Sequence, residues 1–414
     1  MGKLRYILTF VLVLALFLSP IKAFADEGKQ PRSDVVTEYY SPDLTDPPIF
    51  DATETVAPIG TILEIPAKSC ILMEVNTGQI LYESESHLKL APASITKVMA
   101  LLLVVEAIDS GLLTTETMIT ASDYACSMGG SQIWLEPGEQ MSVNDLLKAA
   151  VIGSANDATV ALGEAVAGSE EGFVKMMNDR AAELGLKDTN FLNSTGLDAD
   201  GHLTSAHDIA IASCELIKHD IIKNYSTIWM DSLRNGESEL VNTNKLVRFY
   251  EGCTGLKTGT TSIAGACLSA TAERNGLELC AVVMGANNSN DRFQGARKLL
   301  DYGFANYTYI TASADAAQLS EIRVLGGTKD FVKPICNKSQ GFLVEKSKAK
   351  DISVENELPK ELKAPIAKGQ QIGVARVVVG EEEIATIPIT AEIDVKKMTF
   401  LYAALEMLKS IFKV

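Results

Sequence analysis

The stretch Ala91–Gly111 reads APASITKVMALLLVVEAIDSG, and it decides how the rest of the chain is arranged. Pro92 suits the first turn of a helix, because its missing N–H would have no helical partner there. Gly111 favours the left-handed conformation that ends many helices. The residues between them are apolar on nearly every face. The pattern therefore predicts a helix that is buried in a core rather than one that lies on a surface.

A serine and a lysine lie near the start of this predicted helix. Ser94 and Lys97 are three residues apart, which places both side chains on one helix face. A serine hydroxyl becomes a nucleophile when a neighbouring base takes its proton, and a lysine can be that base when desolvation or another cation lowers its pKa. The alternative is a capping serine beside a lysine that reaches solvent. The same spacing also recurs elsewhere, for example at Ser86 and Lys89.

Length, charge and composition limit the class of protein. The chain has 414 residues, 47% hydrophobic and 22% charged, which leaves room for two soluble globular domains. The net charge of −16 argues against nucleic acid as a partner. The seven cysteines contain no Cys-x-x-Cys pair, and we interpret them as buried small hydrophobic residues. The histidines show no zinc-binding spacing, so His202 and His207 are expected to be structural, and neither metal nor cofactor is predicted.

The N-terminal 58 residues predict a signal peptide and a linker. Residues 1–25 combine a basic start, a short apolar run and the small-x-small sequence Ala23-Phe24-Ala25. These features predict export and cleavage before Asp26, with an uncleaved anchor as the alternative. Residues 26–58 are acidic and contain several prolines, which predicts an extended, weakly ordered linker.

Residues 396–414 predict an amphipathic helix at the other end. Leu401, Leu405 and Leu408 recur at steps of three and four residues, and four lysines outnumber a single glutamate. A basic amphipathic helix on an otherwise acidic, exported protein predicts an anchor that lies in the plane of a membrane surface. The segment is too short and too charged to span a bilayer. The alternative is a helix packed against its own domain.

The region between these ends predicts an α/β domain, residues 59–306, with a largely antiparallel sheet. Two apolar runs on either side of Asn76-Thr77-Gly78 predict a β-hairpin over residues 68–82. Helical patterns follow at 143–152, 158–167, 173–184 and 297–304, and strand patterns at 240–249, 265–272 and 278–284. The Gly- and Thr-rich residues 252–261 predict an edge strand that a ligand can approach closely.

The sequence pattern changes near Tyr309, and this change predicts a separate small all-β domain, residues 307–395. Short alternations of apolar and polar residues are separated there by Gly, Lys and Pro. They lie at residues 320–325, 341–344, 371–379 and 384–393.

Three short motifs stand in order along the α/β domain: Ser94-Ile95-Thr96-Lys97, Ser154-Ala155-Asn156 and Lys257-Thr258-Gly259. In this order and at these wide spacings, the set resembles the penicillin-binding protein and serine β-lactamase superfamily. Residues 130–135 and 195–202, and the pair Arg292-Phe293, are similar to the low-molecular-mass penicillin-binding proteins, the serine-type D-alanyl-D-alanine carboxypeptidases. The resemblance covers residues 66–304 well, and continues more loosely to the C-terminal helix.

The resemblance implies a transpeptidase-like domain of the β-lactamase type, with an antiparallel sheet and a helical lobe. An all-β domain and a C-terminal amphipathic helix would follow it. The implied reaction removes the terminal D-alanine of peptidoglycan stem peptides ending in D-Ala-D-Ala, with β-lactam antibiotics as covalent inhibitors. The implied location is the outer face of the cytoplasmic membrane or the cell wall. A D,D-endopeptidase, a β-lactamase and a catalytically silent binding or sensing module are the alternatives.

The chemistry of such a reaction gives the motif residues their expected roles. Ser94 would attack the carbonyl between the two D-alanines, and neutral Lys97 would take its proton. Lys257 would help to hold Lys97 neutral, because two nearby cations disfavour each other's charge. Ser154 would relay a proton to the departing amine, and Asn156 would orient the substrate amide and the lysine. Simpler interpretations make Asn156 a helix cap and Lys257 a solvated strand residue.

The third motif and an arginine are expected to bind the substrate. The backbone N–H groups of Ser94 and Thr260 would form an oxyanion hole. Thr258 and Arg292 would bind the terminal carboxylate, and Gly259 would let the substrate backbone lie against the strand. Alternatively, Arg292 pairs with a nearby acid such as Asp291. The sequence identifies no base for deacylation.

Overall fold

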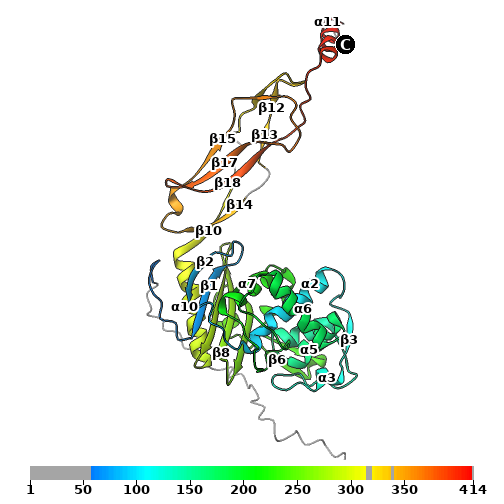
Figure 1. Cartoon of the computed structure of the whole chain (residues 1–414), viewed down its shortest axis with the longest axis vertical. Helices are drawn as coiled ribbons and strands as arrows, with labels where there is room; N and C mark the ends of the chain where they lie inside the picture. The colour runs from blue at the N-terminus through cyan, green and yellow to red at the C-terminus, as the bar shows by residue number, and fades with distance from the viewer. Residues whose placement is uncertain (1–56, 314–318, 337–339, 413–414) are drawn as a thin grey trace, which may run out of the picture. The chain divides into compact units, whose positions relative to one another are not determined.

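The fold is described from a computed structural model of the chain, over residues 57–313, 319–336 and 340–412 (Figure 1). The predicted signal peptide, residues 1–25, lies outside these ranges, as does the predicted linker up to residue 56.

A five-stranded antiparallel sheet organises the first domain. Its strand order is β2-β1-β9-β8-β7, which confirms the antiparallel sheet and the edge position of the Gly- and Thr-rich strand β7. The strands span Ser69–Glu74 (β1), Ile80–Ser84 (β2), Cys253–Thr261 (β7), Gly265–Arg274 (β8) and Leu277–Ala286 (β9). The predicted hairpin is the antiparallel pair β1 and β2.

Both faces of this sheet are covered. Successive residues of a strand point to opposite faces, and strand β1 shows it: Ile71 and Met73 pack in one hydrophobic core, whereas Cys70 and Leu72 pack in another. The first core holds α2 (Lys97–Asp109) and the helical lobe, and the second holds α10 (Ser289–Asn306). In Figure 1, α10 and the helical lobe accordingly lie on opposite sides of the sheet.

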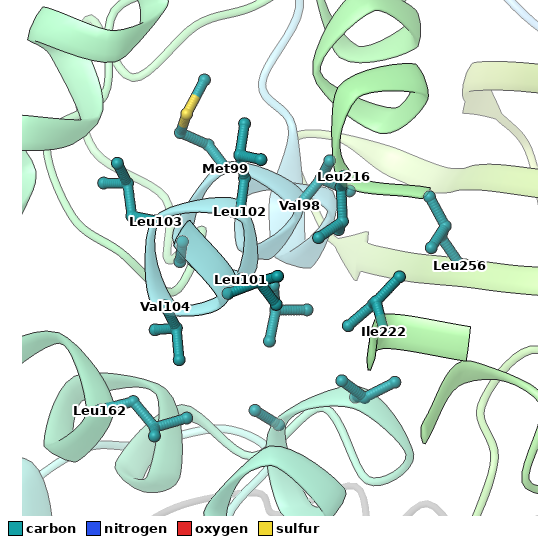
Figure 2. Close-up of a cluster of buried hydrophobic side chains, with 14 of the residues drawn as sticks. Val98, Met99, Leu101, Leu102, Leu103, Val104, Leu162, Leu216, Ile222 and Leu256 are labelled. Atoms are coloured by element: carbon teal, nitrogen blue, oxygen red, sulfur yellow. The ribbon is translucent and has the colours of Figure 1, made fainter. Parts of the chain in front are cut away.

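The predicted central helix is buried on nearly every face. A 3-10 turn, η1 (Ala93–Thr96), leads into α2, and ten of the thirteen residues of α2 are buried. Its apolar side chains point outward on all sides into the core, which also contains Leu162, Leu216 and Leu256 from neighbouring helices and strand β7 (Figure 2). Burial of a leucine side chain stabilises the fold by about 1.5–3 kcal/mol relative to its exposure, so this helix contributes much of the core.

The other helices of the lobe are α3 (Asp123–Cys126), α4 (Val143–Val151), α5 (Asn156–Ala167), α6 (Glu170–Glu183), α7 (Ala206–Ile217), α8 (Asp220–Ser226) and α9 (Leu246–Phe249). The minor strands are β3 (Met118–Thr120), β4 (Gln140–Ser142), β5 (Met230–Leu233) and β6 (Ser238–Val241), with a short turn η2 (Arg234–Gly236). Helix α4 begins after Ser142, whose hydroxyl accepts the N–H of Asp145.

Two elements differ from the sequence-based expectation. The predicted strand 240–249 is wrong beyond Val241, because Asn242 and Asn244 turn the chain by accepting backbone N–H groups two residues ahead, and a short helix follows. Helix α7 was not predicted at all. Its Ser205 caps Asp208 N–H, and its apolar side packs against α2, β1 and β9.

The second domain is entirely β, as expected, around its own apolar core. Two strands, β10 (Tyr307–Ala312) and β14 (Gln340–Glu345), form one sheet, and β11 (Ile322–Leu325), β12 (Phe331–Val332) and β16 (Glu361–Lys363) form another. A four-stranded sheet contains β13 (Pro334–Ile335), β15 (Ile352–Glu357), β17 (Gln371–Val379) and β18 (Glu382–Ala391), and a turn η4 (Ala349–Asp351) precedes β15. The strand predicted at 371–379 coincides with β17.

The C-terminal segment contains the predicted helix, α11 (Phe400–Phe412). Large apolar side chains of its first turns are exposed, with Phe400 92% and Leu401 71% accessible. Within the described residues, no helix has the length and apolar character needed to cross a bilayer.

Candidate active site

The candidate nucleophile lies on the tight turn that enters α2. Ser94 is half-buried in η1, next to Ala93, which adopts the left-handed conformation at φ +49°. Two glycines from distant elements press against this turn. A Cβ on Gly196 would lie 1.8 Å from Ala93 O, and one on Gly259 would lie 2.7 Å from Ser94 N. Gly259 therefore lets strand β7 approach the nucleophile itself, in addition to any role toward substrate.

Lys97 is completely buried beneath Ser94, and its amine has three neighbours. Nζ lies 2.5 Å from Asn156 Oδ1, 2.8 Å from Thr195 O and 3.1 Å from Ser94 Oγ. The amide and carbonyl oxygens can only accept hydrogen bonds. A neutral amine has two N–H groups for those two acceptors, which leaves its lone pair for the Ser94 hydroxyl. Burial lowers the pKa of Lys97 to about 7, so the neutral form is accessible at neutral pH.

Asn156 joins the amine to a loop on the other side. It is the first residue of α5, whose cap is Ala155, so the simpler interpretation as a capping residue is wrong. While Oδ1 accepts from Lys97, Nδ2 donates to Gly129 O at 2.6 Å. The side-chain amide is thereby fixed in one orientation, with its oxygen toward the lysine.

Lys257 is 1% exposed, which excludes the interpretation as a solvated strand lysine. Its Nζ donates to Thr258 O at 3.0 Å. Burial holds its pKa well below the ordinary value, and the positive charges of Lys97 and Arg292 lower the pKa further. Burial is the largest cause of the low pKa of Lys97, and the two buried lysines disfavour each other's charge, so the role of Lys257 in keeping Lys97 neutral stays a prediction.

Two carboxyl groups act on the pKa of the buried amine through their charge, and neither was predicted. Asp157 and Glu170 both raise the pKa of Lys97 against the effect of burial. Asp157 is fully buried and accepts the N–H groups of Ile133 and Leu135, as well as that of Ala158. Its position directly after the Ser154-Ala155-Asn156 motif was the available sequence signal.

The loop that supplies Thr195 O lies in residues 195–202, which were identified from the sequence only by their resemblance to the carboxypeptidase family. Asn193 Oδ1 accepts the N–H groups of Thr195, Gly196 and Leu197, which folds the loop around one side chain. His202 Nδ1 accepts Leu192 N–H, so Nε2 carries the proton and donates to Thr96 Oγ1 at 2.9 Å. Burial lowers the pKa of His202 to about 4, and its expected structural role is confirmed.

The remaining predicted residues surround this centre less directly. Ser154 is 4% exposed at φ +62°, and within the described chain its hydroxyl makes no hydrogen bond. Thr258 Oγ1 donates to Thr243 Oγ1 at 2.7 Å. Arg292 is 4% exposed, and one of its nitrogens donates to Gly259 O at 3.0 Å and Thr260 Oγ1 at 2.8 Å.

The structure thus brings Ser94, Lys97 and Asn156 into direct contact, and holds β7 beside them. A half-buried serine hydroxyl next to a buried amine of low pKa is the arrangement expected of a serine enzyme that uses a lysine as its base. Comparison with known proteins agrees. Residues 52–288, more than half of the chain, match the family described as D-alanyl-D-alanine carboxypeptidase, peptidase S11. Residues 307–397 match the C-terminal domain of penicillin-binding protein 5.

The chain belongs to the D-alanyl-D-alanine carboxypeptidase family, and its activity is that of a serine-type D-Ala-D-Ala carboxypeptidase. It is 40% identical to the D-alanyl-D-alanine carboxypeptidase DacF of Bacillus subtilis, over 81% of this chain and 87% of that protein. It is 30% identical to a D-alanyl-D-alanine endopeptidase of Pseudomonas aeruginosa, over 64% of this chain and 86% of that protein.

Solved structures show the same likeness. Penicillin-binding protein 5 from Haemophilus influenzae superposes with a TM-score of 0.69 at 32% identity, covering 81% of this chain and 99% of that one. Penicillin-binding protein D2 from Listeria monocytogenes, solved with ampicillin bound, gives a TM-score of 0.54 at 31% identity, covering 59% of this chain and 100% of that one.

Proposed function

We propose that this enzyme removes the terminal D-alanine from peptidoglycan stem peptides through an ester on Ser94. The observation that carries the proposal is the three-fold setting of Lys97 Nζ, between Ser94 Oγ, Asn156 Oδ1 and Thr195 O. Two obligate acceptors occupy both N–H groups of the neutral amine, so its lone pair is directed at the serine. A cation there would donate to all three oxygens and could not take the proton.

In the first half-reaction, Lys97 takes the proton of Ser94 as the oxygen attacks the carbonyl between the D-alanines. The Oγ–C bond forms, the C–N bond breaks, and the departing amine receives a proton. We assign the delivery of that proton to Ser154, because its hydroxyl is unused by the protein and lies two residues before Asn156. The proton that Lys97 took from Ser94 then passes on to Ser154, and Lys257, whose pKa is low, relays it by gaining one proton and giving one up. Lys97 is thereby neutral again before the second half-reaction.

In the second half-reaction, water attacks the ester and releases the shortened peptide. The amine of Lys97 lies 3.1 Å from the ester oxygen position, Ser94 Oγ, so we assign it as the base here too. It takes a proton from the water, and a proton returns to Ser94 as the acyl bond breaks. The same buried group therefore serves both steps, which answers the absence of a separate deacylation base in the sequence.

Strand β7 provides the surface for the substrate. We propose that the N–H groups of Ser94 and Thr260 bind the oxyanion, a contribution of about 3–4 kcal/mol for each donor in comparable sites. Arg292 acts mainly through β7, because its guanidinium already donates to Gly259 O and Thr260 Oγ1. Its positive charge, together with the Thr258 hydroxyl, favours a substrate that ends in a carboxylate.

The relative with bound ampicillin supports a further proposal, that β-lactams acylate Ser94 of this enzyme. We also propose that α11 lies on a membrane surface, because its described apolar side chains are exposed and lysines flank it. Together with the predicted signal peptide, this would place the enzyme on the outer face of the cytoplasmic membrane, next to the cell wall.

A test compares the mature enzyme with Ser94→Ala on two substrates, a diacyl-Lys-D-Ala-D-Ala peptide and a cross-linked muropeptide. We expect the mature enzyme to release D-alanine from the first substrate and the Ser94→Ala variant to release none. Cleavage of the cross-linked substrate alone would instead favour an endopeptidase. The match to the endopeptidase relative covers 64% of the chain and that to the carboxypeptidase covers 81%, which favours carboxypeptidase activity.

A further inference from the structure

The loop that holds Lys97 is itself held by a second carboxylate. Ser194 is fully buried and directly precedes Thr195, whose carbonyl accepts from Lys97. The Ser194 N–H donates to Glu170 Oε1 at 2.8 Å, and the Ser194 hydroxyl donates to Oε2 at 2.9 Å. This two-point contact joins the first turn of α6 to the residue beside the Thr195 carbonyl. The reaction steps described above make no use of Glu170.

The charge of Glu170 also reaches the amine. Burial raises the pKa of the Glu170 carboxyl, while the bonds from Ser194 and the charge of Lys97 lower it. In return, Asp157 on α5 and Glu170 on α6 raise the pKa of Lys97. Lys257 on β7, whose pKa is low, also interacts with the charge of Lys97, and His202, which is hydrogen-bonded to the adjacent Thr96, is neutral at neutral pH. Glu170 is thus one of two negative charges that favour the protonated lysine.

We propose that Glu170 is a positioning residue for the general base: through Ser194 it holds the Thr195 carbonyl on Lys97, and so fixes the amine that accepts the Ser94 proton. The inference rests on the proposed role of Lys97 as the base. Both donors of Ser194 point at carboxylate oxygens, so an ionised Glu170 satisfies them together. Helix α6 therefore fixes the position of the amine's acceptor and the electrostatic field around it at once.

The test is the pH dependence of acylation by a fluorescent penicillin, with release of D-alanine measured in parallel. Glu170→Gln removes the negative charge that favours protonated Lys97, so the acid limb of the profile should move to lower pH by about one unit. The maximal rate should fall several-fold, because an amide matches the two Ser194 donors less well. Glu170→Asp keeps the charge but shortens the reach, so its limb should stay while its maximal rate falls.

Glu171→Gln is the matched control, because it makes the same charge change at the adjacent, exposed residue of α6. Its profile should coincide with that of the wild type. A Glu170→Gln profile that also coincides would overturn the inference. If Glu170→Gln does not fold, Ser194→Ala tests the positioning part: an unchanged maximal rate would then refute it. A wild type that neither binds penicillin nor releases D-alanine would refute the proposed function instead.

Discussion

The active site and helix α11 depart in opposite ways from the usual distribution of side chains. Around α2, two lysine amines are buried, with Lys97 0% and Lys257 1% exposed. On α11, large apolar side chains are exposed, with Phe400 92% and Met407 70% accessible. Each arrangement costs free energy in water, unless a partner compensates it.

The compensation differs between the two regions, and this difference is informative. The buried amine of Lys97 finds its acceptors within the fold, and low pKa removes the rest of the penalty. On α11, by contrast, Phe400 and Leu401 are largely exposed to solvent. The three oxygen neighbours of Lys97 therefore lie within one domain, whereas the partner that we propose for α11 is a membrane surface. Substitutions can test both regions, and their expected effect on catalysis decreases from the active site to α11.

The largest effect is expected from Lys97→Met, which keeps the length of the side chain and removes the amine. Without a base, Ser94 retains its proton, and acylation by penicillin should fall by about 10³-fold or more. Stopped-flow acylation measures the rate, and the unfolding temperature shows whether the variant is folded. A folded variant that still acylates within tenfold of wild type would disprove the role of Lys97.

The second-largest fall in acylation rate is expected from Gly196→Ala, which tests how the loop packs against the turn that carries Ser94. The new Cβ would lie 1.8 Å from Ala93 O, so the loop or the turn must move. A displacement of about 1 Å at a reacting group can reduce the rate by about 10²-fold.

Gly201→Ala is the matched control for this variant. Gly201 lies in the same loop and has the same φ of +86°, but its new Cβ would meet no atom closer than 4.0 Å. Both variants carry the same backbone strain, and only Gly196→Ala carries the clash. Equal acylation rates in the two variants would show that close approach to Ala93 does not matter for catalysis.

These positions also show what sequence can reveal. The buried helix, the hairpin, the edge strand and the Ser94, Lys97 and Asn156 contacts follow from apolar patterns and side-chain motifs. Thr195 contributes a carbonyl and Gly196 contributes the absence of a side chain, so neither leaves a chemical signature in a motif. Glu170 lies 73 residues from Lys97 in the chain, and only folding brings its charge near the amine. The low pKa at Lys97 depends on burial, which the surrounding apolar pattern predicts and the Ser94 and Lys97 pair alone does not encode.

A further prediction concerns the pH dependence of the wild type. Lys97 is active when neutral, and burial lowers its pKa to about 7 from the ordinary 10.5. Acylation should therefore rise about tenfold per pH unit below pH 7 and level off above it. A flat penicillin acylation profile between pH 5.5 and pH 8.5 would exclude titration of the base in this range.

The low pKa of Lys97 also predicts how the free energy of unfolding depends on pH. Between pH 7 and pH 10.5 the unfolded chain holds a proton on Lys97 that the folded chain has lost, so this residue makes the folded state more stable as pH rises. Lys97→Met should reduce that rise. Urea unfolding of both proteins at pH 7 and pH 9.5 measures it, and an identical increase in the two proteins would contradict the prediction.

The smallest effect on catalysis is expected at α11. Leu401 and Leu405 are 71% and 49% exposed, and burial of a leucine side chain contributes about 1.5–3 kcal/mol. Leu401→Asp with Leu405→Asp should therefore weaken binding to phosphatidylglycerol vesicles at least tenfold, while D-alanine release from a soluble peptide stays unchanged.

Leu325→Asp with Phe331→Asp makes the same charge change at exposed apolar residues of the β domain, and should leave vesicle binding intact. Equal losses in both double variants would mean that net charge, and not the apolar face of α11, governs association. Loss of activity in the α11 variant would mean that the active site depends on α11 after all.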